Sequence, residues 1–441
     1  MSTWFAGAAW VGGRVARNVR LTVAAGRFTQ VEEGVPAAPG DATLPGLVLP
    51  GFANAHSHAF HRALRGRTHD GGGTFWTWRE RMYAVSAHLD PDSYLALARA
   101  TYAEMALAGV SGVGEFHYLH HAPGGARYAD PNAMGHALVE AARQAGIRLT
   151  LLDTCYLAGG LAAQGHGPLA PEQLRFSDGS ADAWAQRVDA LGELPPHARA
   201  GAAIHSVRAV LRDDLPTVVQ AAGGRPLHVH LSEQPAENEA CLAAYGMSPT
   251  AVLGDADVLG PRTTAVHATH LTAADIALLG TTGTTACFCP TTERDLADGI
   301  GPARGLLDAG SPLALGSDQH AVVDLLEEAR ALEMDERLAS LQRGRLPMPV
   351  LVEALTSAGQ RSIGWDDAGR IEVGARADLV ALRLDTVRTA GADPAQAVLA
   401  ASAADVDTVL VDGAVVVAGG RHVLGDVGTL LTEAITPLWA G

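Results

Sequence analysis

The segment GFANAHSHAFH, residues 51–61, places three imidazole side chains within six residues. Side chains two residues apart on a β-strand point to the same face, so His56 and His58 are expected to project together from a strand end. Two imidazole nitrogens on one face can bind a single divalent ion. An isolated pair of this kind is more often a turn cap and a core residue, so the metal hypothesis needs further ligands.

Two later segments contain such ligands. His230 in HVHLSE adds a third nitrogen, and Asp318 in GSDQH adds a carboxylate oxygen. Three imidazoles and a carboxylate suit Zn²⁺, with Fe²⁺ or Mn²⁺ as the other candidates. A water would complete five-coordination. We therefore expect one divalent metal ion, and we expect the neighbouring His228 to be a supporting or core residue.

The absence of lysine bears on the number of metal ions. All 32 basic residues are arginines. A bridged metal pair needs an additional ligand, commonly a carboxylated lysine, and Glu115 and Cys155 are the remaining alternatives for a bridge. The sequence therefore favours a single ion. It also excludes Schiff-base chemistry and a phosphate-binding loop that depends on lysine.

Eight short apolar runs with β-strand character alternate with helix-like segments in the central part of the chain. The runs lie at residues 47–58, 109–118, 148–156, 200–207, 226–233, 263–270, 284–290 and 312–319. Helical spacing of apolar residues is clear at 92–109, 131–146 and 323–344. Strands alternating with helices predict a parallel sheet, and eight such units predict an α/β fold with a distorted (β/α)8 TIM barrel.

The predicted strands end in ionisable residues. Glu115, His117, Asp153 and His205 join the metal candidates in this position. Active sites of such barrels lie at the carboxyl ends of the strands. We therefore expect these side chains to meet at one mouth of the barrel.

The two chain ends have a different pattern. Residues 1–49 and 365–441 contain short apolar runs separated by Gly, Asn and Pro, which is typical of strands and turns. We expect both ends to combine in one small β-sandwich domain, and residues 50–364 to form the barrel. The GGG tract at 71–73 is either the flexible part of a lid or an ordinary loop.

Composition limits the partners. The net charge of −16 argues against a nucleic-acid partner, so a bound anion must be held by local arginines. No segment is apolar enough for a membrane span, and the start of the chain lacks the features of a signal peptide, so a cytoplasmic location is expected. The four cysteines lack paired metal-site spacing and are expected to be buried, reduced thiols.

HSH, HVHLSE, HATH and GSD, in this order along the chain, resemble the amidohydrolase superfamily. The segments HSHAF, FWTWRERMY, EFHYLHH, IHSVRAV, HLSEQPAE and LGSDQHAVVDLLEE resemble its branch that deiminates N-formimidoyl-L-glutamate in histidine degradation. This resemblance implies hydrolysis to N-formyl-L-glutamate and ammonia. It also implies a homodimer.

The resemblance implies specific roles at the site. Asp318 would accept a proton from the attacking water, His267 would stabilise the developing charge, and Glu233 would carry a proton to the departing nitrogen. Recognition of a small dicarboxylate would fall to residues that match the branch, namely Arg79, Tyr118, His205 and Arg208. His61 departs from the pattern, because the branch usually has Gln there; we expect it on the substrate side.

Two other functions remain open. A related aminohydrolase could act on a nucleobase or another ring amine, for which stacking aromatic residues would be expected instead of arginines. A catalytically inactive binding or assembly protein would have lost a metal ligand or the proton shuttle. All the metal-ligand and catalytic positions are present in this chain, which favours an enzyme.

Overall fold

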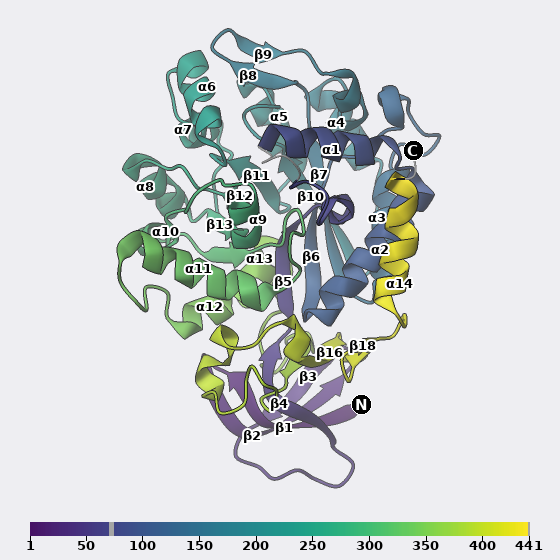
Figure 1. The fold of residues 1–441 in the computed structure, drawn as a ribbon, viewed down its shortest axis with the longest axis vertical. Helices are drawn as coiled ribbons and strands as arrows, with labels where there is room; N and C mark the ends of the chain where they lie inside the picture. Colours follow the sequence, from purple (N-terminus) through teal and green to yellow (C-terminus); the bar gives the residue numbers. More distant parts are fainter. Residues whose placement is uncertain (70–74, 440–441) are drawn as a thin grey trace.

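The computed structural model describes residues 1–69 and 75–439, except for the side chains of residues 75 and 76. The prediction about the GGG tract at 71–73 therefore lies outside the described residues. Figure 1 shows a large unit of strands surrounded by helices, with a smaller β layer at one end.

The larger unit is built around eight parallel strands, as the sequence predicts. They are β5 (Phe52–Ser57), β6 (Val110–His117), β7 (Arg148–Cys155), β10 (Ala198–Ile204), β11 (Leu227–Leu231), β12 (Thr263–His267), β13 (Thr285–Phe288) and β14 (Leu313–Leu315). Each strand pairs with the next one along the chain. The barrel closes through an isolated parallel bridge between Ser57 and Asp318.

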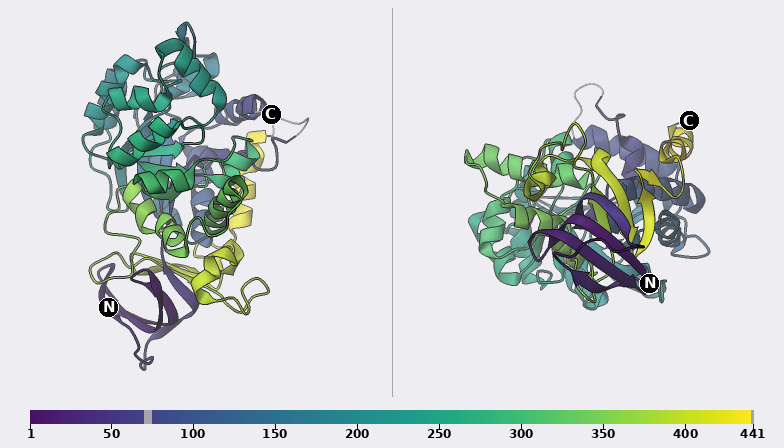
Figure 2. Two further views of the ribbon diagram at one scale, coloured as in Figure 1. Left: turned by 90° about the vertical axis from the view of Figure 1, so that its left-hand side faces the viewer. Right: turned by 90° about the horizontal axis from the view of Figure 1, so that it is seen from below.

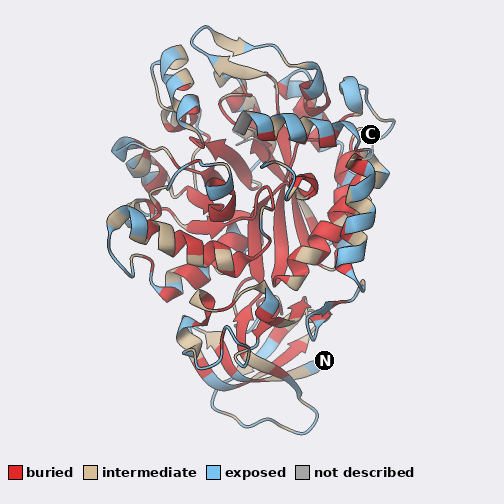
Figure 3. Cartoon of the chain, in the orientation of Figure 1, coloured by how far each residue is buried: buried red, intermediate tan, exposed pale blue. Residues whose placement is uncertain are grey.

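Helices surround the strands (Figure 2). They are α1 (Phe75–Ala87), α2 (Pro91–Leu107), α3 (Ala133–Ala145), α4 (Ala181–Asp189), α5 (Leu215–Ala222), α6 (Pro235–Tyr245), α7 (Pro249–Asp255), α8 (Ala273–Thr282), α9 (Pro290–Asp295), α10 (Ala303–Ala309), α11 (Leu325–Ser340), α12 (Met348–Leu355) and α13 (Ser357–Ser362). Strands covered on both faces read as nearly continuous apolar runs, and every residue of β6 and β7 is buried (Figure 3).

Both chain ends contribute to a second eight-stranded sheet. Its strands are β1 (Ser2–Val11), β2 (Arg14–Ala24), β3 (Arg27–Glu32), β4 (Ala42–Pro50), β15 (Leu379–Leu382), β16 (Val406–Val411), β17 (Ala414–Ala418) and β18 (Arg421–His422). Most pairs are antiparallel, whereas β1 and β4 are parallel. The expected α/β architecture, a barrel with a β unit from both ends, is confirmed.

The division of the chain at residues 49 and 365 stays a prediction. Although it follows the strands of the second sheet in sequence, α14 (Val427–Ile435) packs beside α2 of the barrel (Figure 1). An ion pair at the base of the barrel also links the two units, because the buried guanidinium of Arg148 contacts the Asp378 carboxylate. The Trp365 ring centroid lies 5.0 Å from Cζ of Arg148.

Two predictions from composition can be compared with the structure. None of the helices among the described residues is long and apolar enough to cross a membrane. All four cysteines are free and buried, as expected.

Candidate metal centre and catalytic cavity

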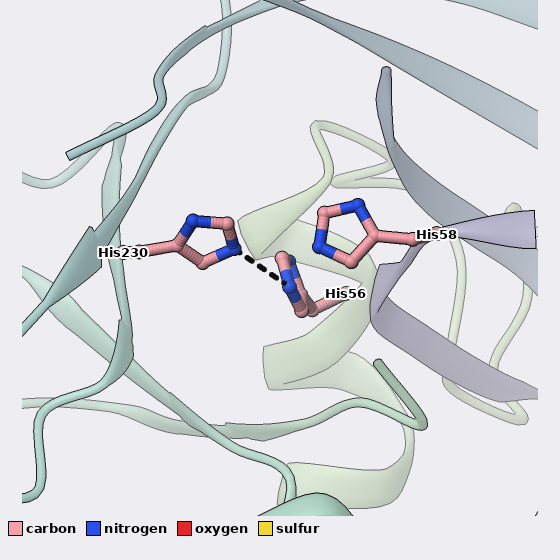
Figure 4. A group of neighbouring side chains, drawn as sticks. All are labelled: His56, His58 and His230. Carbon is pink, nitrogen blue, oxygen red and sulfur yellow. Dashed lines mark hydrogen bonds between the residues drawn. The ribbon is translucent and has the colours of Figure 1, made fainter. Parts of the chain in front are cut away.

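Four side chains from three strand ends converge at the mouth of the barrel. His56 and His58 come from the end of β5 and its following residue, and His230 comes from β11 (Figure 4). The Nε2 atoms of His56 and His230 lie 3.2 Å apart. Asp318, just after β14, places Oδ1 3.4 Å from Nε2 of both His56 and His58. The structure thus brings together the four residues that the sequence singled out.

The backbone fixes this arrangement where the barrel closes. The Asp318 N–H donates to the His56 carbonyl at 3.0 Å, and the His58 N–H donates to the Asp318 carbonyl at 3.1 Å. Asp318 has φ +42°, a left-handed conformation that is unfavourable for a residue with a side chain. His267, at φ +68°, is held in the same region. Strained backbone of this kind clusters at functional sites, where the surrounding structure supports it.

The donor atoms suit a divalent ion. Nδ1 of His58 bonds to the Phe116 carbonyl at 2.9 Å and acts as the donor, which directs the Nε2 lone pair toward the centre. Burial lowers the pKa of His58 to about 3 and the pKa of His56 and His230 well below the ordinary value. Neutral imidazole is the form that binds a metal. Three neutral nitrogens and a carboxylate oxygen therefore fit a divalent ion.

Glu115 is not placed as a bridging ligand. Ser57 Oγ and the Ala59 N–H both donate to its carboxylate at 2.6 Å. Burial raises the pKa of Glu115 to about 8. Ser57 Oγ also lies 3.2 Å from Nε2 of His320, whose Nδ1 is 2.9 Å from Ser317 Oγ. This buried network supports the strand and the loop that hold the candidate ligands.

Three ionisable strand-end residues do not face the mouth, so that expectation was wrong for them. Phe116 stacks on His230 with 4.2 Å between ring centroids. Because Phe116 faces the barrel interior, the residues on either side of it, Glu115 and His117, face the outer side of β6. Asp153 lies on the outer face of β7, where its carboxylate accepts two hydrogen bonds from Arg187 at 2.8 Å. Successive residues of a strand face opposite sides of the sheet, which explains why only some strand-end residues reach the mouth.

His267 lies between three carboxylates. Its Nε2 is 3.8 Å from Glu233 Oε1 and 3.8 Å from Asp318 Oδ2. Its Nδ1 is 3.3 Å from Glu293 Oε1. Although burial opposes it, Glu233 and the hydrogen bond to Glu293 raise the pKa of His267 well above the ordinary value. The ring can therefore donate from both nitrogens.

A cavity of about 360 Å³ opens above this centre. Its walls include all the predicted site residues except His56, which lies fully buried beneath it. Nε2 of His61 lies 2.8 Å from the Tyr118 hydroxyl, so the third imidazole of the opening segment faces the cavity and is tied to another predicted substrate contact. His205 packs edge-on against Tyr156, with 4.5 Å between ring centroids.

Two arginines line the cavity. Arg79 extends from α1, with its guanidinium 5.6 Å from the Tyr83 ring centroid. Arg208 follows β10 and donates from Nη2 to Glu233 Oε2 at 3.1 Å. Both line the same 360 Å³ space. One pocket therefore contains two cationic groups and the candidate proton shuttle.

Several cavity and supporting residues could not be identified from the sequence. Glu237 and Glu293 contact predicted site residues, and Gln173 donates from Nε2 to the Tyr156 hydroxyl at 2.8 Å. Glu237 lies in the first turn of α6, four positions after Glu233, which precedes the helix, so helical spacing does not relate the two residues. Glu293 and Gln173 come from segments that carry no local metal or catalytic pattern.

Known proteins share this architecture. Residues 47–416 match the amidohydrolase family. Formimidoylglutamate deiminase of Pseudomonas aeruginosa is 38% identical, over 96% of both chains. The 8-oxoguanine deaminase of the same organism is 30% identical, over 91% of this chain and 89% of that protein. A crystal structure of an amidohydrolase from Brucella melitensis superposes with a TM-score of 0.93 at 32% identity, covering 100% of each chain.

The chain therefore belongs to the amidohydrolase family. Within that family, the fold and the relatives indicate a hydrolytic deaminase.

Proposed function

We propose that this protein hydrolyses the formimidoyl group of N-formimidoyl-L-glutamate, a step of histidine degradation. Water adds to the amidine carbon, the terminal C–N bond breaks, and N-formyl-L-glutamate and ammonia are released. The observation that carries the proposal is that Arg79 and Arg208 line the same cavity. This cavity lies above the candidate ligands His56, His58, His230 and Asp318. A small dicarboxylate calls for planar cationic donors of this kind.

The cofactor in this proposal is one divalent metal ion, Zn²⁺ first and Fe²⁺ or Mn²⁺ as alternatives. His56, His58, His230 and Asp318 would hold it. When bound, such an ion lowers the pKa of a coordinated water so that the water becomes a nucleophile near neutral pH.

The surrounding residues would move the protons. Asp318 accepts the proton of the attacking water through the carboxylate oxygen that faces His267. His267 then donates from Nε2 to the attacking oxygen and stabilises the tetrahedral intermediate. Glu233, whose Oε1 lies 3.8 Å from that nitrogen, carries a proton to the departing nitrogen so that ammonia leaves instead of amide ion.

Substrate orientation would depend on the opposite wall. Arg79 and Arg208 pair with the two carboxylates, and Tyr118 and His205 border the amidine. His61, hydrogen-bonded to Tyr118, takes the place of the Gln usual in this branch. Neutral imidazole has one donor and one acceptor, so the hydroxyl can still be oriented toward the substrate.

Deamination of a nucleobase or another ring amine is the second candidate. Aromatic rings line the cavity, which favours a flat substrate, and they belong to Trp78, Tyr83, Tyr118, Tyr156 and Phe176. The two arginines favour the dicarboxylate, since a neutral ring has no group that would pair with them.

Ammonia release separates the two candidates. The purified metal-loaded enzyme is assayed with N-formimidoyl-L-glutamate, 8-oxoguanine, guanine, cytosine and adenosine. The proposal expects kcat/KM for the amidine to exceed the others by at least about a hundredfold, the discrimination expected when charged groups of the pocket are left unpaired. A preference for any nucleobase would refute it. A homodimer, implied by the resemblance alone, stays a prediction that light scattering can test.

A further inference from the structure

Arg208 is shared between two glutamates of the cavity wall. Its Nη2 donates to Glu233 Oε2 at 3.1 Å, and its Nε lies 3.5 Å from Glu237 Oε2. The Arg208 side chain is 20% exposed, toward the cavity that it lines, whereas the Glu237 side chain is fully buried. One cation therefore touches both the candidate proton shuttle and a carboxylate with no role in the chemistry described above.

The two glutamates differ in their freedom to move. Glu237 lies in the first turn of α6, where its N–H donates to the Gln234 carbonyl at 3.0 Å. The ion pair with Arg208 is the main compensation for the burial of its carboxylate. Glu233 precedes the helix, follows the strained Ser232 at φ +50°, and borders the cavity.

A substrate carboxylate at Arg208 would be the third anion on one guanidinium. Three carboxylates cannot all keep close contact with a single positive charge, because their mutual repulsion in a cavity of low dielectric is large. Glu237 is fixed by its burial in the helix. Glu233 is therefore the group that gives up its contact.

We propose that Glu237 is a positioning residue that retains Arg208 in the cavity, and that binding of a substrate carboxylate to Arg208 releases Glu233 for proton transfer. This inference rests on the proposed function. It makes recognition of the distant carboxylate part of the catalytic step, because Glu233 stays bound to Arg208 until that carboxylate arrives. Binding energy far from the amidine thus contributes to kcat as well as to KM.

Truncated substrates test this coupling between carboxylate binding at Arg208 and proton transfer by Glu233. N-formimidoylglycine lacks the side-chain carboxylate, and N-formimidoyl-4-aminobutyrate lacks the α-carboxylate, so one of them leaves Arg208 without its anion. For that compound we expect the wild-type kcat to fall at least about tenfold relative to N-formimidoyl-L-glutamate. Arg208→Met should then raise kcat for the same compound at least about fivefold, while it raises KM for the full substrate.

Glu237→Gln should change kcat for the truncated compound in the opposite direction. Without its second carboxylate, Arg208 holds Glu233 more tightly, so kcat for the truncated compound falls a further threefold or so. Glu239→Gln, an exposed change on the same helix, is the matched control and should alter nothing. Metal content and thermal midpoint are measured for each variant, because a merely structural role of Glu237 would change these and affect all substrates equally.

The outcomes separate the two proposals. If the wild type releases no ammonia from N-formimidoyl-L-glutamate, the proposed function fails and the coupling falls with it. If the wild type turns this substrate over normally but Arg208→Met leaves or lowers kcat for both truncated compounds, only the coupling is overturned.

Discussion

Nδ1 of His267 lies 3.3 Å from Oε1 of Glu293, and the same oxygen accepts the Cys289 N–H at 2.8 Å. The backbone therefore holds the Glu293 carboxylate in place, and the carboxylate in turn orients the His267 ring. Because Nδ1 faces Glu293, Nε2 is directed toward Glu233 and Asp318. An imidazole held in this way by a carboxylate keeps one orientation and one pattern of protonation.

Glu293→Gln should impair the chemical step more than binding. The amide keeps the shape of the side chain but removes the charge that stabilises a protonated His267. We expect kcat to fall about 10- to 100-fold with KM within about twofold of the wild type, and the pH profile of kcat to shift. Steady-state kinetics between pH 5 and 9 provide the measurement. An unchanged pH profile would mean that Glu293 only supports the fold.

Glu233→Gln should abolish most turnover and leave the metal in place. The amide cannot accept and pass on a proton, so we expect kcat to fall about 10²- to 10⁴-fold. Metal content by atomic spectroscopy should stay near that of the wild type, since this side chain is not among the candidate ligands. Turnover retained at the wild-type level would rule out the proton-transfer role.

Arg208→Met should weaken binding of the full substrate. Loss of a guanidinium that pairs with a buried carboxylate costs about 2–5 kcal/mol, which is measured here as a rise in KM. Arg212→Met is a suitable control, because that residue pairs with Asp255 at 2.8 Å on the exposed surface. If KM does not change, the anion site lies elsewhere in the cavity.

The fold could be predicted because its signals are local. The eight apolar runs, the helical spacing between them and the strand-like chain ends are each visible within one segment. The metal candidates were also visible, since HSH places two ligands on one strand face and the barrel brings strand ends together.

Other features of the site depend on long-range contacts. Glu293 is 26 positions from His267, and Gln173 is 17 positions from Tyr156, so no spacing rule relates them. The outward orientation of Asp153 depends on which strand face meets Arg187. The ion pair between Arg208 and Glu233 depends on how two loops approach over the barrel mouth.

The buried carboxyl of Glu115 predicts a pH-dependent stability. Burial raises its pKa from 4.5 to about 8, so the folded protein retains a proton that the unfolded chain loses above pH 4.5. The resulting contribution to stability is complete below pH 4.5 and is lost as the pH rises to about 8. The full change is on the order of 5 kcal/mol.

Comparison with Glu115→Gln isolates this effect. The amide has nearly the same shape, and its oxygen can still accept from the Ala59 N–H, but it does not titrate. We therefore expect the free energy of unfolding of the wild type to fall relative to the variant between pH 5 and 8, measured by urea denaturation of the metal-loaded proteins. Parallel curves for the two proteins would show that Glu115 is ionised in the folded state throughout this range.

The most direct test of the account is the metal stoichiometry of the wild type and of single alanine variants at the candidate ligands His56, His58, His230 and Asp318. We expect about one divalent ion per chain in the wild type and a loss of at least about 90% in His230→Ala, because all the candidate ligands would bind the same ion. His228→Ala, two positions before His230 on the same strand, should keep its metal. Full metal content in the His230 and Asp318 variants would contradict the account.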